Sequence, residues 1–365
     1  MSRITRSGPT RGQTMGRGLL PHYLLRSKAG WGRRVSAALL ALSAIFSVSA
    51  SAPAAEQVKI GIGYGLAFLP AYICEDLKLV EKHAKAQHLD LRAVYERFSS
   101  ASATADAIRS RAIDMGPFGI APLLEAWDKG RAANAARRQV VAVSGMTTLP
   151  LVLLSDRPAV RALSDLRARD RIAVPTLTSP QTFFLQMQAE KVFGKYDRLR
   201  GDVVEMSHAK ALAALIAGDK SVTAYFSSPP YTQIALKDGK IHPILSSEQV
   251  IGGKASLLVL GATKAYIERH RQIAQSVEQA MDDAGALIRD DPRRAARIFL
   301  THEPSKALKA ADVEAVLRQN KDEFGSAVAG IGAFTQFMAR HGALKTPPQS
   351  WKDVVAPALL HSPST

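Results

Sequence analysis

Four places in this chain share a pattern that could bind a ligand: a short apolar run of strand character, then small or hydroxyl residues, then a helical pattern. They are Phe98-Ser99-Ser100, Thr178-Ser179-Pro180, Met206-Ser207 and Phe226-Ser227-Ser228. Backbone N–H groups at a helix start, helped by the helix dipole, stabilise an anionic or polar ligand without any charged side chain. The same hydroxyls could act only as N-caps, each stabilising its helix by about 1 kcal/mol. Because the pattern occurs four times, we expect these turns to share a cleft.

The motifs of common catalytic and cofactor sites are absent from the sequence. There is no H-E-x-x-H, C-x-x-C, G-x-S-x-G or G-x-x-x-x-G-K-[ST]. The run Gly61-Ile62-Gly63-Tyr64-Gly65-Leu66 is similar to a dinucleotide-binding loop, but Leu66 stands where the third glycine is needed for helix packing. The histidines are scattered, so we expect no metal site. Near the expected turns, only His208 and Glu205 could serve a catalytic mechanism.

Aromatic residues near the expected turns could form the apolar walls that ligand clefts usually need. They are Tyr64, Phe68, Phe118 and Tyr231. Each of them alone could equally be a core residue, so they support a cleft only if the turns converge in space.

The stretch from Val58 to Tyr72 predicts a strand, an exposed loop and a helix. Its first five residues alternate apolar and compact side chains, as in a buried strand, and Gly63 and Gly65 permit a sharp turn. Pro70 suits a first helical position. A loop at the carboxyl end of a parallel strand is where open α/β sheets bind ligands. The glycines could also serve only an ordinary turn.

The pattern of the remaining chain predicts two α/β units. Strand and helix patterns alternate up to the strand 140–144, which predicts a parallel sheet covered by helices. Residues 146–150 interrupt this pattern, and we expect the chain to cross there into a second unit that begins with the strand 171–174. Near the strand 255–260 the chain should return to the first unit, and its remainder is helical in pattern.

The N-terminus is typical of an export signal. Residues 1–34 carry eight Lys or Arg and no acidic residue, an apolar run follows from Val35 to Ala50, and Ala52-Pro53-Ala54 gives an A-x-A cleavage pattern. The leader supplies half of the formal net charge of +16, which leaves +8 for the remainder. The remaining Lys and Arg are spread along the predicted helices. They form no basic block and are not interleaved with aromatic residues, so we expect no nucleic-acid binding. Cys74 is the only cysteine, and its place in an apolar helix pattern predicts a packing role.

Over essentially the whole chain after the leader, the sequence resembles the periplasmic solute-binding proteins of ABC importers of the nitrate/sulfonate/taurine type. The stretches that carry the resemblance are Gly63 to Tyr72, Ala105 and Ile108 with Ile113 to Gly119, Asp165-Leu166 with Ile172 to Pro175, and Ala211-Leu212 with Ala217-Gly218. The resemblance implies an α/β, bilobed periplasmic-binding-protein fold of the second topology, whose two α/β lobes are joined by two crossing strands. We expect a signal peptide at residues 1–55, lobe 1 at 56–148 and 253–365, the latter with the C-terminal helices, and lobe 2 at 149–252.

In that family, loops that correspond here to residues 64–69, 99–102, 117–119, 178–181 and 227–231 line the ligand cleft. With a residue of the first crossing added, the expected ligand-binding set is Tyr64, Leu66, Phe68, Ser99, Ser100, Phe118, Gly119, Thr147, Thr178, Ser179, Gln181, Ser227, Ser228 and Tyr231. The chain departs from the family pattern in three places. Lys78 replaces a glycine that usually ends the first helix, Val222 or Thr223 replaces an acidic residue, and Ser228-Pro229-Pro230 replaces an Asp-Pro pair before Tyr231.

The resemblance therefore implies an exported receptor that closes two lobes over a small organic solute, such as a sulfonate or a nitrate-like anion, and presents it to an ABC importer permease in the inner membrane. We expect a periplasmic monomer without catalytic residue, cofactor or metal. Two alternatives stay open. One is an enzyme on the same fold that acts on a vitamin or pyrimidine precursor, and the other is a periplasmic module that senses its ligand for a signalling receptor.

Overall fold

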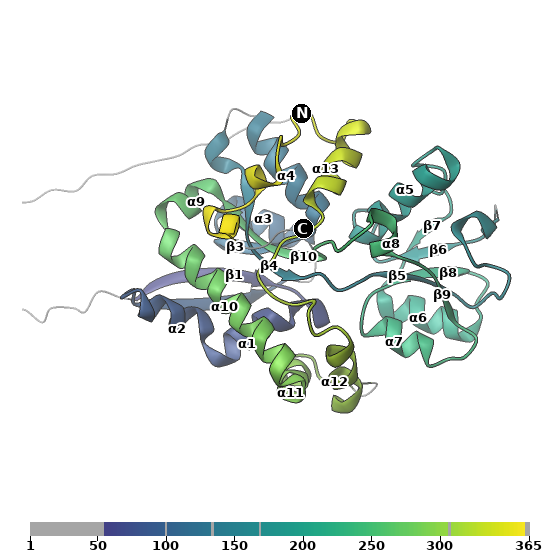
Figure 1. Ribbon diagram of the computed structural model, residues 1–365, viewed down its shortest axis with the longest axis horizontal. Helices are drawn as coiled ribbons and strands as arrows, with labels where there is room; N and C mark the ends of the chain where they lie inside the picture. Colours follow the sequence, from purple (N-terminus) through teal and green to yellow (C-terminus); the bar gives the residue numbers. More distant parts are fainter. Residues whose placement is uncertain (1–54, 99–100, 133–134, 168, 306–307, 362–365) are drawn as a thin grey trace, which may run out of the picture. The chain divides into compact units, whose positions relative to one another are not determined.

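Strand β1 (Glu56–Ile62) lies inside a five-stranded sheet, as the alternation of its side chains predicts. The structure is a computed structural model that describes residues 55–98, 101–132, 135–167, 169–305 and 308–361. Residues 55–365 form one unit, whereas the expected signal peptide lies outside the described residues except for Ala55 (Figure 1). Among the described residues, no helix combines the length and apolar character needed to cross a bilayer.

Two mixed sheets of five strands each organise the described chain. The first sheet, which defines lobe 1, has the order β2 (Leu91–Arg97), β1, β3 (Met115–Phe118), β10 (Leu258–Thr263) and β4 (Val140–Thr147). The second sheet, which defines lobe 2, has the order β7 (Val203–Glu205), β6 (Ile172–Val174), β8 (Ala224–Ser227), β5 (Val152–Ser155) and β9 (His242–Ser246).

The expectation of a purely parallel first sheet is wrong, because β10 lies between β3 and β4 and runs antiparallel to both. Strands β2, β1 and β3 are parallel to one another, as expected from their helical connections. The reason is topological. Strand β4 carries the chain out of lobe 1 and β10 carries it back, so these two neighbours run in opposite directions. In lobe 2, β5 is likewise antiparallel to its neighbours β8 and β9.

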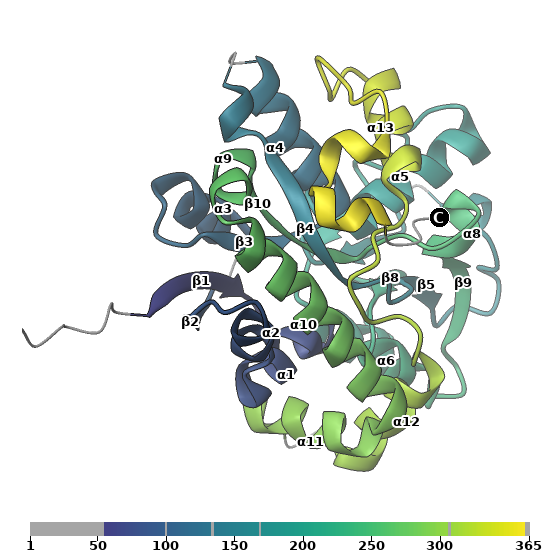
Figure 2. The same cartoon turned by 60° about the vertical axis from the view of Figure 1, so that its left-hand side comes forward.

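Helices cover both sheets (Figures 1 and 2). Those of lobe 1 are η1 (Leu66–Phe68), α1 (Leu69–Leu77), α2 (Leu79–Ala86), α3 (Ala101–Ser110), α4 (Ile120–Ala132), η2 (Ala136–Arg138), α9 (Lys264–Arg269), α10 (Arg271–Asp290), α11 (Pro292–His302) and α12 (Ala310–Gln319). Those of lobe 2 are η3 (Leu163–Asp165), α5 (Pro180–Phe193), α6 (His208–Ala217), α7 (Tyr231–Leu236) and α8 (Ser247–Ile251). The chain ends with α13 (Ile331–Arg340), η4 (Trp351–Val354) and η5 (Pro357–His361).

Helix α10 is the longest element of lobe 1, and Figure 2 shows it lying across the first sheet. It packs on α1, α2 and β4 through buried residues three or four positions apart, such as Ile273, Val277 and Met281. Between α1 and α2, Lys78 adopts the left-handed conformation (φ +50°). The helix therefore does end at the position where the family has glycine, at the steric cost of a side chain in that conformation. Cys74 is fully buried beside α10, as its packing role predicts.

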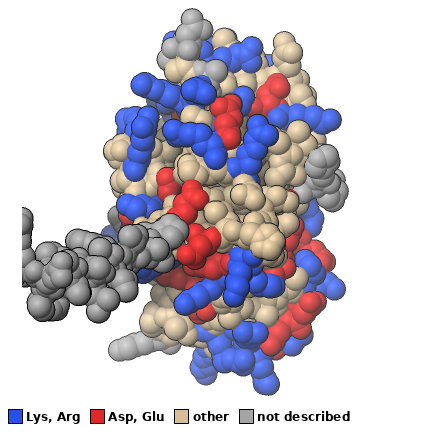
Figure 3. Space-filling view, turned by 90° about the vertical axis from the view of Figure 1, so that its left-hand side faces the viewer, with Lys and Arg blue, Asp and Glu red and all other residues tan. Residues whose placement is uncertain are grey.

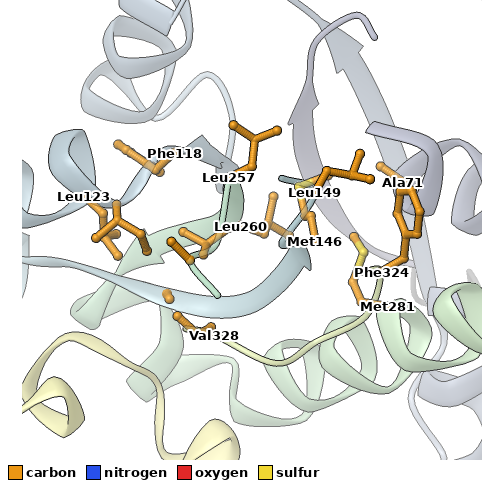
Figure 4. Close-up of a cluster of buried hydrophobic side chains, with 14 of the residues drawn as sticks. Ala71, Phe118, Leu123, Met146, Leu149, Leu257, Leu260, Met281, Phe324 and Val328 are labelled. Carbon is orange, nitrogen blue, oxygen red and sulfur yellow. The ribbon is translucent and has the colours of Figure 1, made fainter. Parts of the chain in front are cut away.

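Buried residues of the two crossings between the sheets are joined by a third segment. Figure 4 shows Met146 and Leu149 of the first crossing and Leu257 of the second in one apolar cluster with Phe324. Backbone hydrogen bonds from residues 323–329 reach both crossings: Thr148 donates to the carbonyl oxygen of Glu323 (2.8 Å), and Ser256 donates to that of Ala329 (3.0 Å). Nothing in the sequence pattern predicted this segment, which we call the brace.

Candidate functional site

Turns from both lobes line a single cavity of about 1400 Å³. Its lobe 1 wall includes the loop between β1 and α1 and the end of β3, and its lobe 2 wall includes the turns before α5 and α7 and the first residue of α6. The cavity lining contains ten of the expected ligand-binding residues: Tyr64, Leu66, Phe68, Phe118, Gly119, Thr178, Ser179, Gln181, Ser228 and Tyr231. Two of the four expected hydroxyl turns, at Thr178 to Pro180 and at Ser228, therefore line one space with the lobe 1 loop, whereas Met206 and Ser207 are not in the lining.

Of the other four expected residues, two are not described and two lie outside the lining. Ser99 and Ser100 lie outside the described residues. Thr147 is buried at the end of β4, where its hydroxyl donates to the carbonyl oxygen of Glu323 in the brace (2.8 Å). Ser227 is buried at the end of β8, and its hydroxyl donates to the carbonyl oxygen of Val152 on the neighbouring strand (2.9 Å). Both expectations are corrected, because these hydroxyls satisfy buried backbone groups.

Two glycines give the lobe 1 loop its form. A Cβ atom on Gly63 would lie 2.6 Å from the ring of Phe68, so the missing side chain makes room for that aromatic residue. Gly65 has φ +110°, which side-chain-bearing residues rarely adopt. The sequence-based interpretation that these glycines serve the turn is confirmed, and the turn places Tyr64, 59% exposed, at the cavity.

Behind this loop, α1 and α11 contribute a buried polar contact. The Tyr72 hydroxyl on α1 lies 2.9 Å from the carbonyl oxygen of Gly63 and 2.6 Å from Oε1 of Glu303. The backbone N–H of Gly65 donates to the same Oε1. Burial, and then the hydrogen bond to Glu303, raise the pKa of Tyr72 well above its usual range. Tyr72 is therefore a permanent hydrogen-bond donor in this cluster.

Glu303, at the C-terminal end of α11, lines the cavity and was missed by the sequence analysis. It follows the amphipathic helix 292–302, and the local pattern gives it no special role. Only the packing of α11 on α1 brings its carboxylate to the loop at Gly65. The one local hint is its position: an acidic residue at a helix C-terminus interacts unfavourably with the helix dipole, so a glutamate there can have another role.

A basic side chain, Arg97 at the end of β2, lies beside this cluster. It does not belong to the cavity lining. Its guanidinium group lies 4.7 Å from the ring centroid of Tyr72 and 5.9 Å from that of Tyr64. Nη2 lies 2.5 Å from Nδ1 of His302 and 3.6 Å from Oε2 of Glu75. Arg97 is thus held by rings, a histidine and a carboxylate on the outer side of Tyr72.

The lobe 2 wall is polar but carries no charge near neutral pH. The ring of His208 stacks on that of Tyr231 (centroids 5.2 Å apart), Nε2 lies 3.2 Å from Oγ of Ser228, and Nδ1 is hydrogen-bonded to the Tyr225 hydroxyl. Burial lowers the pKa of His208 to about 4. The imidazole is therefore neutral at pH 7, with one nitrogen donating and the other accepting.

Gln181, in the first turn of α5, is the clearest unpaired polar side chain of this wall. Only 3% of the residue is exposed, it lines the cavity, and no described residue hydrogen-bonds to its side-chain amide. The amide is not among the described side-chain groups that are buried without a partner, so it is open to the cavity and can bond to a group that enters there. Ser179, at the N-cap position, makes no side-chain capping bond in the structure.

The other end of the cavity lies against lobe 1 alone and is basic. Asp114, Val140 and Thr263 line this end, and the strand register places them at the opposite end of β3 from Phe118. The basic side chains of this end come from α3, α4, η2, α9 and the turn after α3: Arg109, Arg111, Lys129, Arg137, Arg138 and Arg269. Figure 3 shows Lys and Arg gathered on the upper part of one face. No Lys or Arg belongs to the described lining of the interlobe end.

The described residues contain no group of three or more His, Cys, Asp or Glu side chains arranged to hold a metal ion. The interlobe end instead combines aromatic rings, neutral donors and acceptors, and one carboxylate. This composition suits a small organic molecule with a few polar groups.

Comparisons with known proteins identify the fold. No protein-family model matches the chain, and no curated protein matches it. Among solved structures, the chain is similar to the alkanesulfonate-binding protein SsuA from Xanthomonas axonopodis bound to MOPS, with 20% identity over 84% of this chain and 99% of that chain and a TM-score of 0.60. It is also similar to the periplasmic aliphatic sulphonate-binding protein SsuA from Escherichia coli, with 18% identity over 82% and 92% and a TM-score of 0.62.

The periplasmic nitrate-binding protein NrtA from Synechocystis is a further match, with 11% identity over 72% of this chain and 70% of that chain and a TM-score of 0.51. At these identities the similarity is one of fold. The expected fold class, two α/β lobes of the periplasmic-binding-protein type, is confirmed.

Proposed function

From the periplasmic-binding-protein fold of this chain, we propose that it is the extracytoplasmic substrate-binding component of an ABC importer. It captures a small organic solute in the interlobe cavity and delivers it to a permease in the membrane. The long basic leader, with its apolar run and A-x-A site, supports export to the periplasm.

One observation carries this proposal. Turns from two separate sheets line one cavity, and a polar group on each side of it has no partner among the described residues. Gln181 has no partner on the lobe 2 side, and Oε2 of Glu303 has none on the lobe 1 side among the described residues. A solute that bonds to both walls interacts more strongly with the closed form than with the open form. Such differential contact is what drives closure.

Closure requires movement at the segments between the sheets, which we place at Thr147 to Leu151 and Gly252 to Ser256. The brace, residues 323–329, hydrogen-bonds to both segments and gives them a common support. Hinge motion of this kind is absorbed by a few residues at the ends of elements.

The test is a thermal-shift screen of the purified protein with sulfonates, nitrate, carboxylates, pyrimidines and amines, followed by calorimetry. We expect at least one class to raise the melting temperature, because a solute at one hundred times its Kd adds about 2.7 kcal/mol of stability. X-ray scattering with and without that solute should show compaction. If no small solute stabilises the protein, the proposal is wrong.

An enzyme on this fold is a second candidate, favoured by the contact between the Ser228 hydroxyl and His208 (3.2 Å). A serine beside a histidine can be a nucleophile with its general base. The pKa of about 4 makes His208 a weak base at neutral pH, and its other nitrogen faces the Tyr225 hydroxyl instead of a carboxylate. Glu205, the other expected catalytic residue, accepts a hydrogen bond from the Leu177 backbone outside the cavity (2.6 Å). Ester or amide turnover that His208→Ala abolishes would favour the enzyme.

A further inference from the structure

The single acidic side chain in the described lining of the interlobe end is Glu303, and one oxygen of its carboxylate has no hydrogen-bond partner among the described residues. Oε1 accepts hydrogen bonds from the Gly65 backbone and the Tyr72 hydroxyl. No described residue hydrogen-bonds to Oε2, and no described Lys, Arg or His lies within ion-pair distance of Glu303. Among the described residues, this carboxylate is therefore held in position without a counter-ion.

Glu303 is the charged side chain in the described lining of the interlobe end, and Arg97 lies next to it, behind Tyr72. His208 is neutral at pH 7, and the described lining of this end has no Lys or Arg. Arg97 is near Tyr72, but its guanidinium group contacts His302 and Glu75 and lies outside the lining. The six basic side chains of the cavity are at the other end of β3.

The charge of Glu303 also reaches the facing lobe. Burial, and then the negative charge of Glu303, raise the pKa of Tyr231 at the start of α7. Tyr231 belongs to the lobe 2 wall, so a solute held between Tyr231 and the lobe 1 loop lies within the field of this carboxylate.

An anion would meet two obstacles at this place. The Gly65 N–H, a donor that an anion could use at this loop, is already bonded to Glu303. A carboxylate without a counter-ion also repels a second negative charge in a partly desolvated site. A cationic nitrogen meets the opposite conditions, because Oε2 is free to accept from it and the rings of Tyr64, Phe68 and Tyr231 can stabilise it through cation–π interactions.

We propose that the solute carries a cationic nitrogen, an ammonium or amidinium group, which binds Oε2 of Glu303 at the lobe 1 wall. This inference rests on the proposed function, because it names the chemical class of the solute that the interlobe cavity takes. The planar or apolar body of the solute lies among the aromatic rings, and its neutral polar groups pair with Gln181 and Ser228 on the lobe 2 wall.

The test uses calorimetry and thermal shift on the purified protein with probes of the same shape and different charge. Benzamidine, benzamide and benzoate share a planar ring and differ in the charge of one substituent, and a wider set of amines is compared with carboxylates and sulfonates of the same carbon skeletons. We expect the cationic member of each series to bind at least tenfold more tightly than the neutral one. We expect no binding of the anions, nitrate included.

Glu303→Gln separates charge from structure, because the amide oxygen can still accept from Gly65 and Tyr72. We expect this variant to keep its melting temperature without solute, to lose at least tenfold in affinity for the cationic probe and to bind the neutral probe unchanged. Glu303→Asp, which keeps the charge but withdraws it, should lose less. The matched control is Glu205→Gln, since Glu205 also accepts a backbone N–H bond but lies outside the cavity, and its affinities should not change.

Two results would overturn the inference while leaving the proposed function intact: an anion that binds the unaltered protein more tightly than its cationic counterpart, or a cationic probe that binds Glu303→Gln as tightly as the unaltered protein. If no solute of any charge binds, the proposed function is wrong and the inference falls with it.

Discussion

The two lobes are held together very differently on the two sides of the interlobe contact. On one side, α13 joins α4 of lobe 1 to α5 of lobe 2. The ring of Phe334, almost fully buried, lies 5.3 Å from that of Phe184 in an edge-on arrangement, and Phe337 contacts Tyr196. On the other side, α7 and α12 are linked by one exposed ion pair between Lys237 and Asp312 (2.6 Å) among the described residues.

This difference indicates how the lobes could move. Buried aromatic contacts are lost only at a large cost, whereas an exposed ion pair contributes about 1 kcal/mol or less. We infer that α13 stays packed on both lobes and acts as the pivot, while the side with α7 and α12 opens. The brace lies with the crossings in the same buried core, which further limits motion to that side.

The largest effect is expected from breaking the pivot. Phe334→Ala removes a buried ring that contacts both Phe183 and Phe184, so we expect a loss of about 3 to 5 kcal/mol in the free energy of unfolding. Urea unfolding followed by circular dichroism measures it. A loss below about 1 kcal/mol would contradict the pivot role, and Leu360→Ala, at an exposed residue, is the control.

A smaller effect on stability is expected from the ion pairs between α5 and the end of α13. Glu190 on α5 bonds to Arg340 (2.9 Å) and His341 (2.8 Å), and the hydrogen bond from Arg340 is the main cause that lowers the pKa of Glu190. Because the folded pKa lies below the unfolded one, the contribution is present above the unfolded pKa and is lost as pH falls through the folded pKa.

We therefore expect Glu190→Gln to cost about 1 kcal/mol or less at pH 7 and to match the unaltered protein at acidic pH, below the folded pKa. Unfolding curves measured from pH 7 down to pH 3 test this. A stability difference that stays constant over that range would show that the ion pairs are not the cause.

The smallest effect on stability is expected on the opening side. Lys237→Ala removes the exposed ion pair to Asp312, so the free energy of unfolding should change little. Because that pair would hold only the closed form, the bound solute should dissociate faster, and added salt should have the same effect on the unaltered protein. Stopped-flow displacement measures both. If Lys237→Ala caused a large loss of stability and left solute dissociation unchanged, the side with α7 and α12 would not be the opening side.

Local patterns predicted much of the described cavity lining. The strand, turn and helix around Gly63, Gly65 and Pro70 were read correctly, because backbone conformation and side-chain alternation are set within a few residues. The hydroxyl turn at Thr178 to Gln181 does line the cavity. The same reasoning failed for Thr147 and Ser227. Their hydroxyls bond to backbone carbonyl groups far away in the sequence, and local patterns do not reveal such partners.

The sequence by itself determined the elements, their order and the residues at the turns, since hydrophobic periodicity, glycine and proline act over short distances. Only the tertiary structure decided that β10 lies between β3 and β4, that the brace joins the two crossings, and that six scattered basic residues gather at one end of the cavity. It also brought Glu303 to Gly65, 238 residues away along the chain. Such long-range contacts depend on how whole helices and sheets pack, and a short stretch of sequence does not determine which distant residues lie next to it.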